Sequence, residues 1–127
     1  MAKLMDEDLV GRYSRLLAAL DEKTRTGVLT WWQSENDKNK FFAATERIKL
    51  SIESVRNDGS SPYRLRIGDD RFPIESIESG LIIDPDSRTT IERMLDGLYW
   101  VVRRHTLKID EKIDELFQDL GVEENYY

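Results

Sequence analysis

Residues 41–77 of this 127-residue chain read FFAATERIKLSIESVRNDGSSPYRLRIGDDRFPIESI, and apolar and polar residues alternate through most of the stretch. A period of two is typical of strands that bury one face. The segments NDGSSP (57–62) and GDD (68–70) interrupt it with residues that favour tight turns. Pro73 cannot donate a backbone hydrogen bond, which places the last strand at an edge of the sheet. The stretch therefore predicts an antiparallel meander with one buried face.

Upstream, VLTWWQ at residues 28–33 has the same period and completes a sheet of four or five strands. It holds two adjacent tryptophans, which must point to opposite faces of a strand. Trp31 shares its face with Leu29, so we expect it in the core. Trp32 shares its face with Thr30, and nothing in the sequence says what covers it.

Helical periodicity flanks the predicted sheet on both sides. A first helix is expected from about Met5 to Thr26, with Gly27 as its stop. A second is expected to start near Ser87, with Asp86 or Ser87 as its cap. The apolar stripe of the first helix is Met5, Leu9, Tyr13, Leu16 and Leu20, with Leu17 and Thr24 at its edge. These helices are the nearest cover for the sheet. We therefore predict an α+β fold: an N-terminal helix, the antiparallel meander, and a C-terminal helical segment packed on one sheet face.

The C-terminal periodicity is compatible with one helix or with two. Its stripe is Ile91, Met94, Leu95, Leu98, Val101, Val102 and His105, continued by Ile109, Ile113, Leu116 and Leu120. One helix over residues 88–120 would be roughly 50 Å long, too long for a domain of this size to cover. We therefore favour a break at HTLKID (105–110), with Asp110 capping a short helix that Gly121 ends.

Length and composition exclude several classes of protein. The chain has the size of a single domain, residues 1–127. It has no cysteine, which excludes disulfides and thiol catalysis and favours the cytoplasm. Seven acidic residues and one lysine after residue 109 account for the whole net charge of −6, so the acidity belongs to the C-terminal helix and tail from about residue 110. No apolar run is long enough to span a bilayer and no signal peptide is visible, so we expect no membrane association.

Trp100 is the least expected residue of the second helix. It lies about 180° around that helix from Ile91, and Gly97, one turn earlier, leaves a hollow beside it. Three arginines lie nearby on the same helix: Arg93, Arg103 and Arg104. Tryptophan with arginine is typical of protein-interface hot spots and also suits base stacking. The alternative to an exposed Trp100 is that the last helix folds back onto the second helix. Phe117 would then cover Trp100, and the carboxylates of the last helix would pair with the arginines.

The outer face of the sheet is a second candidate surface. Its predicted anion-binding residues are Lys49, Arg64 and Arg66, with Trp32 beside them. Aromatic groups among cations on an open sheet are typical of single-stranded nucleic-acid binding. Three cations near Glu53 are few for such a site, and the RNA-recognition signature is missing. An ordinary solvated face is therefore favoured.

The sequence holds no catalytic or metal-binding signature. His105 is the only histidine, and a lone histidine on an apolar stripe is expected to be packed in the core. DPDSRTTIERML (84–95) begins like a calcium loop, but Thr89 and Leu95 stand where glycine and glutamate are needed. No P-loop, dinucleotide-binding glycine pattern, nucleophile elbow or zinc motif occurs. We expect neither enzyme activity nor a cofactor or metal.

Three segments resemble parts of small uncharacterised bacterial and phage-borne proteins: YSRLLAALDEKTRTGVLTW (13–31), YRLRIGDD (63–70) and LYWVVRRHTLKIDEKIDELFQDL (98–120). The resemblance covers most of the chain. It implies a helix, an antiparallel meander and C-terminal helices, and it favours Trp31 as the inward tryptophan. It implies no activity, ligand or catalytic residue.

These observations favour a non-enzymatic cytoplasmic interaction module, an accessory of a mobile element or of a defence or counter-defence pair. Its partner would be another protein or a second copy of the chain. Trp100 or Trp32 would be the buried anchor, and arginines would set the orientation. The alternatives are nucleotide or single-stranded nucleic-acid binding, which is not favoured, and acidic mimicry of nucleic acid by the C-terminal segment.

Overall fold

The computed structural model describes residues 7–69, 73–78 and 85–122. Helix α1 spans Glu7–Arg25, and five strands follow: β1 (Trp31–Gln33), β2 (Lys40–Ala44), β3 (Lys49–Ser54), β4 (Tyr63–Gly68) and β5 (Pro73–Glu78). Helices α2 (Pro85–Thr106) and α3 (Ile109–Leu120) come last. The strands form one antiparallel sheet in the order β1-β2-β3-β4-β5. The α+β prediction is confirmed, with Pro73 in an edge strand.

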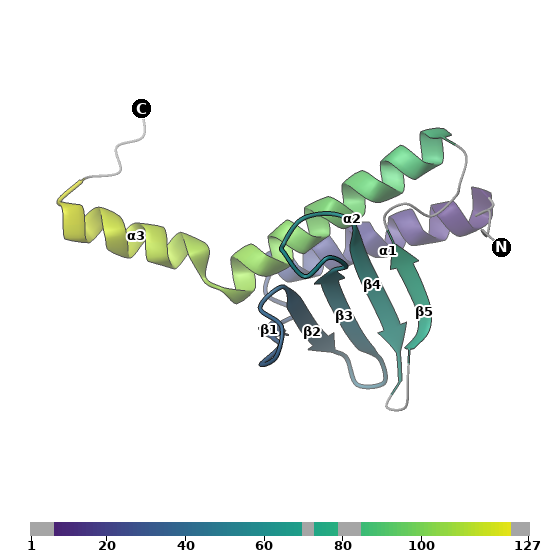
Figure 1. Ribbon diagram of the computed structural model, residues 1–127, viewed down its shortest axis with the longest axis horizontal. Helices are drawn as coiled ribbons and strands as arrows, with labels where there is room; N and C mark the ends of the chain where they lie inside the picture. The colour runs from purple at the N-terminus through teal and green to yellow at the C-terminus, as the bar shows by residue number, and fades with distance from the viewer. Residues whose placement is uncertain (1–6, 70–72, 79–84, 123–127) are drawn as a thin grey trace.

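Helices α1 and α2 lie side by side on one face of the sheet, whereas α3 continues past its end (Figure 1). The packed core joins alternate strand residues to both helices. Its members from the sheet include Trp31, Phe41, Ile52, Leu65 and Ile77. Residues of the opposite parity, such as Trp32 and Arg64, point to the other face of the sheet. The sheet therefore has one face covered by helices and one outer face that the helices leave open.

Helix α1 buries a stripe that is rotated from the predicted one. Leu17 and Thr24, expected at the edge of the stripe, are among the most buried side chains of the core. Thr24 is accommodated because its hydroxyl donates a hydrogen bond to the carbonyl of Leu20 at 2.7 Å. Gly27 follows the helix with φ 79°, which confirms the predicted stop. Met5 and the side chain of Leu9 lie outside the described residues.

The buried face of helix α2 includes Tyr99, which was not in the predicted apolar stripe. Tyr99 is fully buried, and its ring lies 4.2 Å from that of Tyr63 and 5.9 Å from that of Phe41, measured between centroids. Its hydroxyl donates to the carbonyl of Asn39 at 3.3 Å. His105, expected in the core, is instead exposed, because it lies in the last turn of α2 and lines an open hollow. The side chains of the predicted caps, Asp86 and Ser87, lie outside the described residues.

The break between the last two helices is confirmed, but Asp110 does not cap the second. Helix α2 ends at Thr106 and α3 starts at Ile109. Between them, Lys108 has a left-handed backbone with φ 53° and ψ 45°, and no side chain caps the start of α3. Gly121, with φ 68°, ends α3 as predicted, and its N–H donates to the carbonyl of Gln118 at 3.1 Å.

Candidate interaction surfaces

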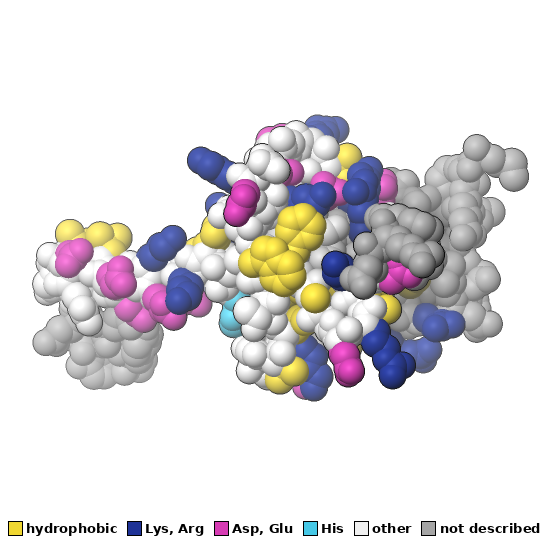
Figure 2. All heavy atoms as spheres, turned by 90° about the horizontal axis from the view of Figure 1, so that it is seen from below, with side chains coloured by type: hydrophobic (Ala, Val, Ile, Leu, Met, Phe, Trp, Pro, Cys, Tyr) yellow, Lys and Arg dark blue, Asp and Glu magenta, His cyan; other side chains and the backbone are white. Residues whose placement is uncertain are grey.

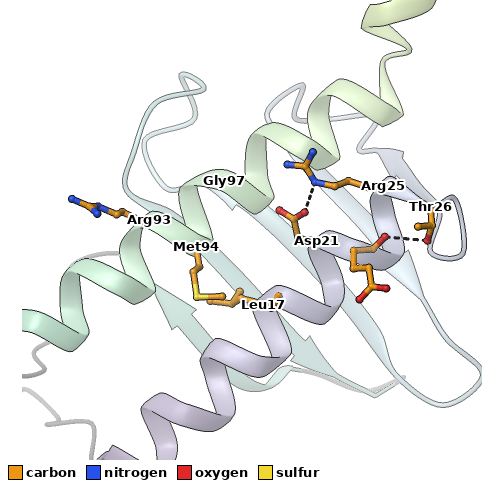
Figure 3. A pocket seen from close by; sticks show the side chains of 9 residues that line it. Leu17, Asp21, Arg25, Thr26, Arg93, Met94 and Gly97 are labelled. Carbon is orange, nitrogen blue, oxygen red and sulfur yellow. Dashed lines mark hydrogen bonds and ion pairs between the residues drawn. The ribbon is translucent and has the colours of Figure 1, made fainter.

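The two helices that cover the sheet leave a groove between them. In Figure 3, Leu17 of α1 and Met94 of α2 approach each other across it. Asp21 and Arg25, which form an ion pair, line its α1 side, and Arg93 lies on its α2 side. The hollow has a volume of about 500 Å³. Its floor is therefore apolar, and its walls carry charges of both signs.

A second hollow continues the first along α2 toward α3. Arg25 and Gly97 line both hollows, so the two form one depression. The second has a volume of about 440 Å³. Its other lining residues are Trp100, Val101, Arg104, His105 and Ile109. We call the two hollows together the α1–α2 groove, and it runs along α2 from Arg93 to the first residue of α3.

Helical spacing and one glycine create the groove. The residues that α2 contributes are three or four positions apart, which puts them on one side of the helix. In the middle of this row, a Cβ built on Gly97 would meet none of the described atoms within 4 Å. The hollow predicted beside Trp100 is therefore confirmed, and it lies where the two parts of the groove meet.

Trp100 forms one wall of the groove and is 52% exposed. Its ring stands edge-on to that of Tyr99, with centroids 5.6 Å apart. The guanidinium carbon of Arg103 lies 5.7 Å from the centroid of the Trp100 ring, within the range of a cation–π contact. Four of the five predicted partner-binding residues therefore lie along α2: Arg103 lies on the Trp100 indole, Arg104 shares its hollow, and Arg93 lines the other hollow. The fifth, Trp32, lies apart from them on the outer face of the sheet.

Two tyrosines beneath this wall are structural groups and not acids or bases at neutral pH. Burial raises the pKa of Tyr99 to about 12. Burial also raises the pKa of Tyr63, as does the negative charge of Asp96, while a hydrogen bond with Trp100 lowers it in part. Both hydroxyls therefore keep their protons at neutral pH.

Helix α3 does not fold back over Trp100. It leads away from the sheet and its helices (Figure 1), and none of its residues is buried. Ile113, Leu116 and Leu120 on its apolar stripe are 37%, 53% and 65% exposed. The alternative in which Phe117 covers Trp100 is therefore not the arrangement in the structure.

A single carboxylate of α3 does reach an arginine of α2. The guanidinium of Arg104 donates to Asp110 through Nε at 3.1 Å and also through Nη2. This hydrogen bond lowers the pKa of Asp110 and raises that of Arg104. Because the pair spans the break between the two helices, it helps to hold α3 in its outward direction.

The outer sheet face carries an aromatic pair that includes Trp32, which is 53% exposed. Its ring stacks on that of Phe42 with centroids 6.0 Å apart, since β1 and β2 place the two residues opposite each other. Lys40 Nζ lies 5.2 Å from the Phe42 centroid. Figure 2 shows a hydrophobic patch in the middle of the body with lysine and arginine side chains beside it. Sequence reasoning missed Phe42 and Lys40, although the inward Phe41 implies that both point outward.

The cations of this face converge on one carboxylate. Glu53 Oε1 lies 3.5 Å from Arg64 Nη1 and 3.7 Å from Arg66 Nε. Its other oxygen lies 3.9 Å from Lys40 Nζ, and the Glu53 side chain is only 13% exposed. Arg64 also pairs with Glu78. Arg64 and Arg66, two of the predicted anion-binding residues, are therefore paired with Glu53. The other predicted residue, Lys49, also interacts within the chain, and it lies farther along β3, opposite Gly68.

The described residues hold neither a metal cluster nor a membrane-spanning helix, and the calcium-loop comparison falls outside them. No three His, Cys, Asp or Glu side chains among residues 7–69, 73–78 and 85–122 could together hold a metal ion. None of the helices in that part of the chain is long and apolar enough to cross a membrane. Asp84 and the side chain of Asp86, on which the comparison with a calcium loop depends, lie outside the described residues.

The α1 wall of the groove, with Asp21 and Arg25, was not predicted from the sequence, because the face that α1 turns toward α2 depends on tertiary packing.

Comparisons with known proteins leave the function to be argued from these surfaces. No family model matches the chain, and no curated protein or solved structure matches it.

Proposed function

We propose that this protein is a non-enzymatic interaction module whose α1–α2 groove receives an apolar helical segment of a protein partner. The observation that carries the proposal is the open hollow at Gly97, next to a tryptophan that is half exposed. Exposed aromatic residues with arginines beside an apolar depression are typical of the energetic centre of protein interfaces. The cysteine-free composition is compatible with a cytoplasmic module.

The dimensions of the groove suit a helix. Its α2 side runs from Arg93 to His105, which at about 1.5 Å per residue is roughly 18 Å, or about three helical turns. Leu17, Met94 and Val101 give it an apolar floor. A helix placed there would set apolar side chains three and four residues apart over that floor, as in other helix-in-groove complexes.

Binding would bury groups that water now contacts. The indole of Trp100 would lose much of its exposed surface, which supplies most of the hydrophobic gain. Arg93 at the rim would pair with an acidic residue of the partner and fix its orientation, while Arg104 keeps its bond to Asp110. An interface anchored in this way depends less on salt than one built on charge alone.

The test compares two glycines of the helix layer. Gly97→Glu puts a carboxylate into the hollow, whereas Gly11→Glu makes the same change at a helical position in α1 that also has open space around it. Affinity capture from native lysate, followed by intact-mass analysis, should recover the same partner with the natural chain and with Gly11→Glu. Gly97→Glu should lose that partner. Identical captured sets from all three proteins would contradict the proposal.

A second candidate is single-stranded nucleic-acid binding on the outer sheet face. The exposed, Phe42-stacked Trp32 beside Lys40 favours it. The convergence of Lys40, Arg64 and Arg66 on Glu53 weakens it, since those charges are already partly neutralised. Salt separates the two functions, because nucleic-acid affinity falls steeply between low and moderate salt.

A further inference from the structure

We infer that the occupant of the α1–α2 groove is helix α3 of a second copy of this chain, so that two copies exchange their α3 helices. The inference rests on the function proposed above and names its partner. It follows from two features of one chain: a groove that nothing described fills, and an amphipathic helix whose apolar side nothing described covers.

Helix α3 gains little stability from its own chain. It has 12 residues, and isolated helices of that length are marginal in water. Its apolar residues nevertheless gather on one side: Ile109, Ile113, Leu116, Phe117 and Leu120. None of them is buried. Such a stripe on a short helix is expected to be covered in the functional form of the protein.

The lengths of helix and groove agree. Twelve residues at about 1.5 Å each make α3 roughly 18 Å long, the same as the α2 side of the groove. A helix docked antiparallel to α2 would place its Leu120 end near Met94 and its Leu116 near the open space at Gly97. The hollow that lacks a side chain would thus receive one of the large apolar side chains of α3.

Charge favours the groove over a second α3 as the binding surface. Helix α3 carries five acidic residues and one lysine, so two α3 helices packed together would repel each other. Among the described residues, the groove is lined by three arginines, Arg25, Arg93 and Arg104, and by two acids, Asp21 and Glu22, so it lacks the excess of negative charge that a second α3 would present. In the antiparallel arrangement Arg93 would also lie near the C-terminal, negative end of the α3 dipole.

The hinge favours exchange between copies over closure within one chain. Lys108 keeps its left-handed backbone while its N–H donates to the carbonyl of His105 at 3.3 Å and its own carbonyl accepts from Lys112 at 3.1 Å. The Arg104–Asp110 pair crosses the same hinge. A chain must remake these contacts to fold α3 into its own groove, whereas a second copy can receive the helix as it stands. Ile109 lines the end of the groove, so the two hinges would meet near a twofold axis.

Light scattering coupled to size exclusion tests the inference on the full chain. The natural protein at high micromolar concentration should have twice the 14.9 kDa chain mass. Leu116→Glu places a charge on the apolar stripe of α3, and Gly97→Glu fills the groove. Each variant should therefore be monomeric. The control Gly11→Glu should remain a dimer. Circular dichroism and urea midpoints check that every variant is folded.

Mixing the two monomeric variants gives the sharper result. The groove is unaltered in Leu116→Glu, and α3 is unaltered in Gly97→Glu. The α3 helix of the second variant should therefore bind the groove of the first, which gives a heterodimer with one intact interface. A mixture that stays monomeric overturns the inference. So does a natural chain of monomeric mass, or a Gly97→Glu variant that still dimerises while Leu116→Glu does not, since that pattern means α3 pairs with α3. If the chain is monomeric but Gly97→Glu still loses a captured protein, the proposed function stands and only the exchange is wrong.

Discussion

The indole N–H of Trp31 donates a hydrogen bond to the hydroxyl oxygen of Thr24 over 2.9 Å, and this joins the first strand of the sheet to the last turns of α1. The Thr24 hydroxyl in turn donates to the carbonyl of Leu20. Both side chains are buried. A buried indole needs an acceptor for its N–H, and Thr24 of α1 provides one on the inward side of the sheet. The arrangement explains structurally why Trp31 lies inside while its neighbour Trp32 lies outside.

Replacing Thr24 by valine should therefore be costly. Valine has a similar shape but no hydroxyl, so the buried Trp31 N–H would lose its partner, at about 1 to 3 kcal/mol of unfolding free energy. Urea unfolding measures this loss, and Thr24→Ser should restore most of it. The control is Thr26→Val, because the Thr26 hydroxyl makes a comparable bond to the carbonyl of Glu22 in an exposed position. Equal losses for the two valine variants would show that the indole bond is not responsible.

Two glycines should respond in opposite directions to the same change. Gly97→Ala should raise the free energy of unfolding by about 1 kcal/mol, because the position is helical and the new methyl group meets open space. Gly27→Ala should lower it by about 1 kcal/mol, since φ there is 79° and alanine adopts that backbone poorly. Thermal or urea unfolding of both variants checks the sign. Stabilisation by both would mean that backbone strain at Gly27 is negligible.

The sequence predicts well what depends on local pattern. The strand periods, the stops at Gly27 and Gly121, the helix break and the hollow at Gly97 all follow from residue type and spacing. The rotation of the buried helix stripes is different, because it depends on which partner surface is offered. Tyr99 is central only because Tyr63 and Phe41 lie beneath it, and those contacts join residues far apart in the chain. The side chain of Asp110 was likewise expected to cap α3, but it instead accepts a hydrogen bond from Arg104 on the preceding helix.

Stability should fall at high pH through Tyr99. Its pKa is about 12 in the folded protein and 10.0 for an ordinary tyrosine, so between these values the unfolded chain releases a proton that the folded protein retains. The contribution of Tyr99 is fully present below pH 10 and is lost as the pH rises toward 12. Urea unfolding across this window measures the slope. Tyr99→Phe should flatten it, and an unchanged slope in that variant would contradict the assignment.

Neutralising Glu53 should expose the charge of the outer sheet face. In Glu53→Gln the cations Lys40, Arg64 and Arg66 lose their shared carboxylate, and we expect tighter binding of an oligothymidylate at low salt than for the natural chain. Each additional phosphate that these cations neutralise should steepen the slope of log affinity against log salt by about 0.7. Fluorescence anisotropy at several salt concentrations measures both. Glu78→Gln, which releases only Arg64, should have a smaller effect. Equal affinity in all three proteins would show that Glu53 does not screen this face.

Helix α2 should be protected against amide hydrogen exchange even in a dilute monomer, whereas protection of α3 should appear only as the protein dimerises. Helix α2 buries Leu95, Leu98 and Tyr99, so its central amides exchange only when the whole fold opens. Helix α3 buries nothing within its own chain, so in a dilute monomer its amides should exchange almost as in an unstructured peptide. When a second chain receives α3, protection should appear along Ile109–Leu120 in proportion to the dimer fraction. Leu116→Glu should abolish the protection of α3 at every concentration, while α2 stays protected. Strong protection of α3 in the dilute monomer would mean that the helix is covered by its own chain.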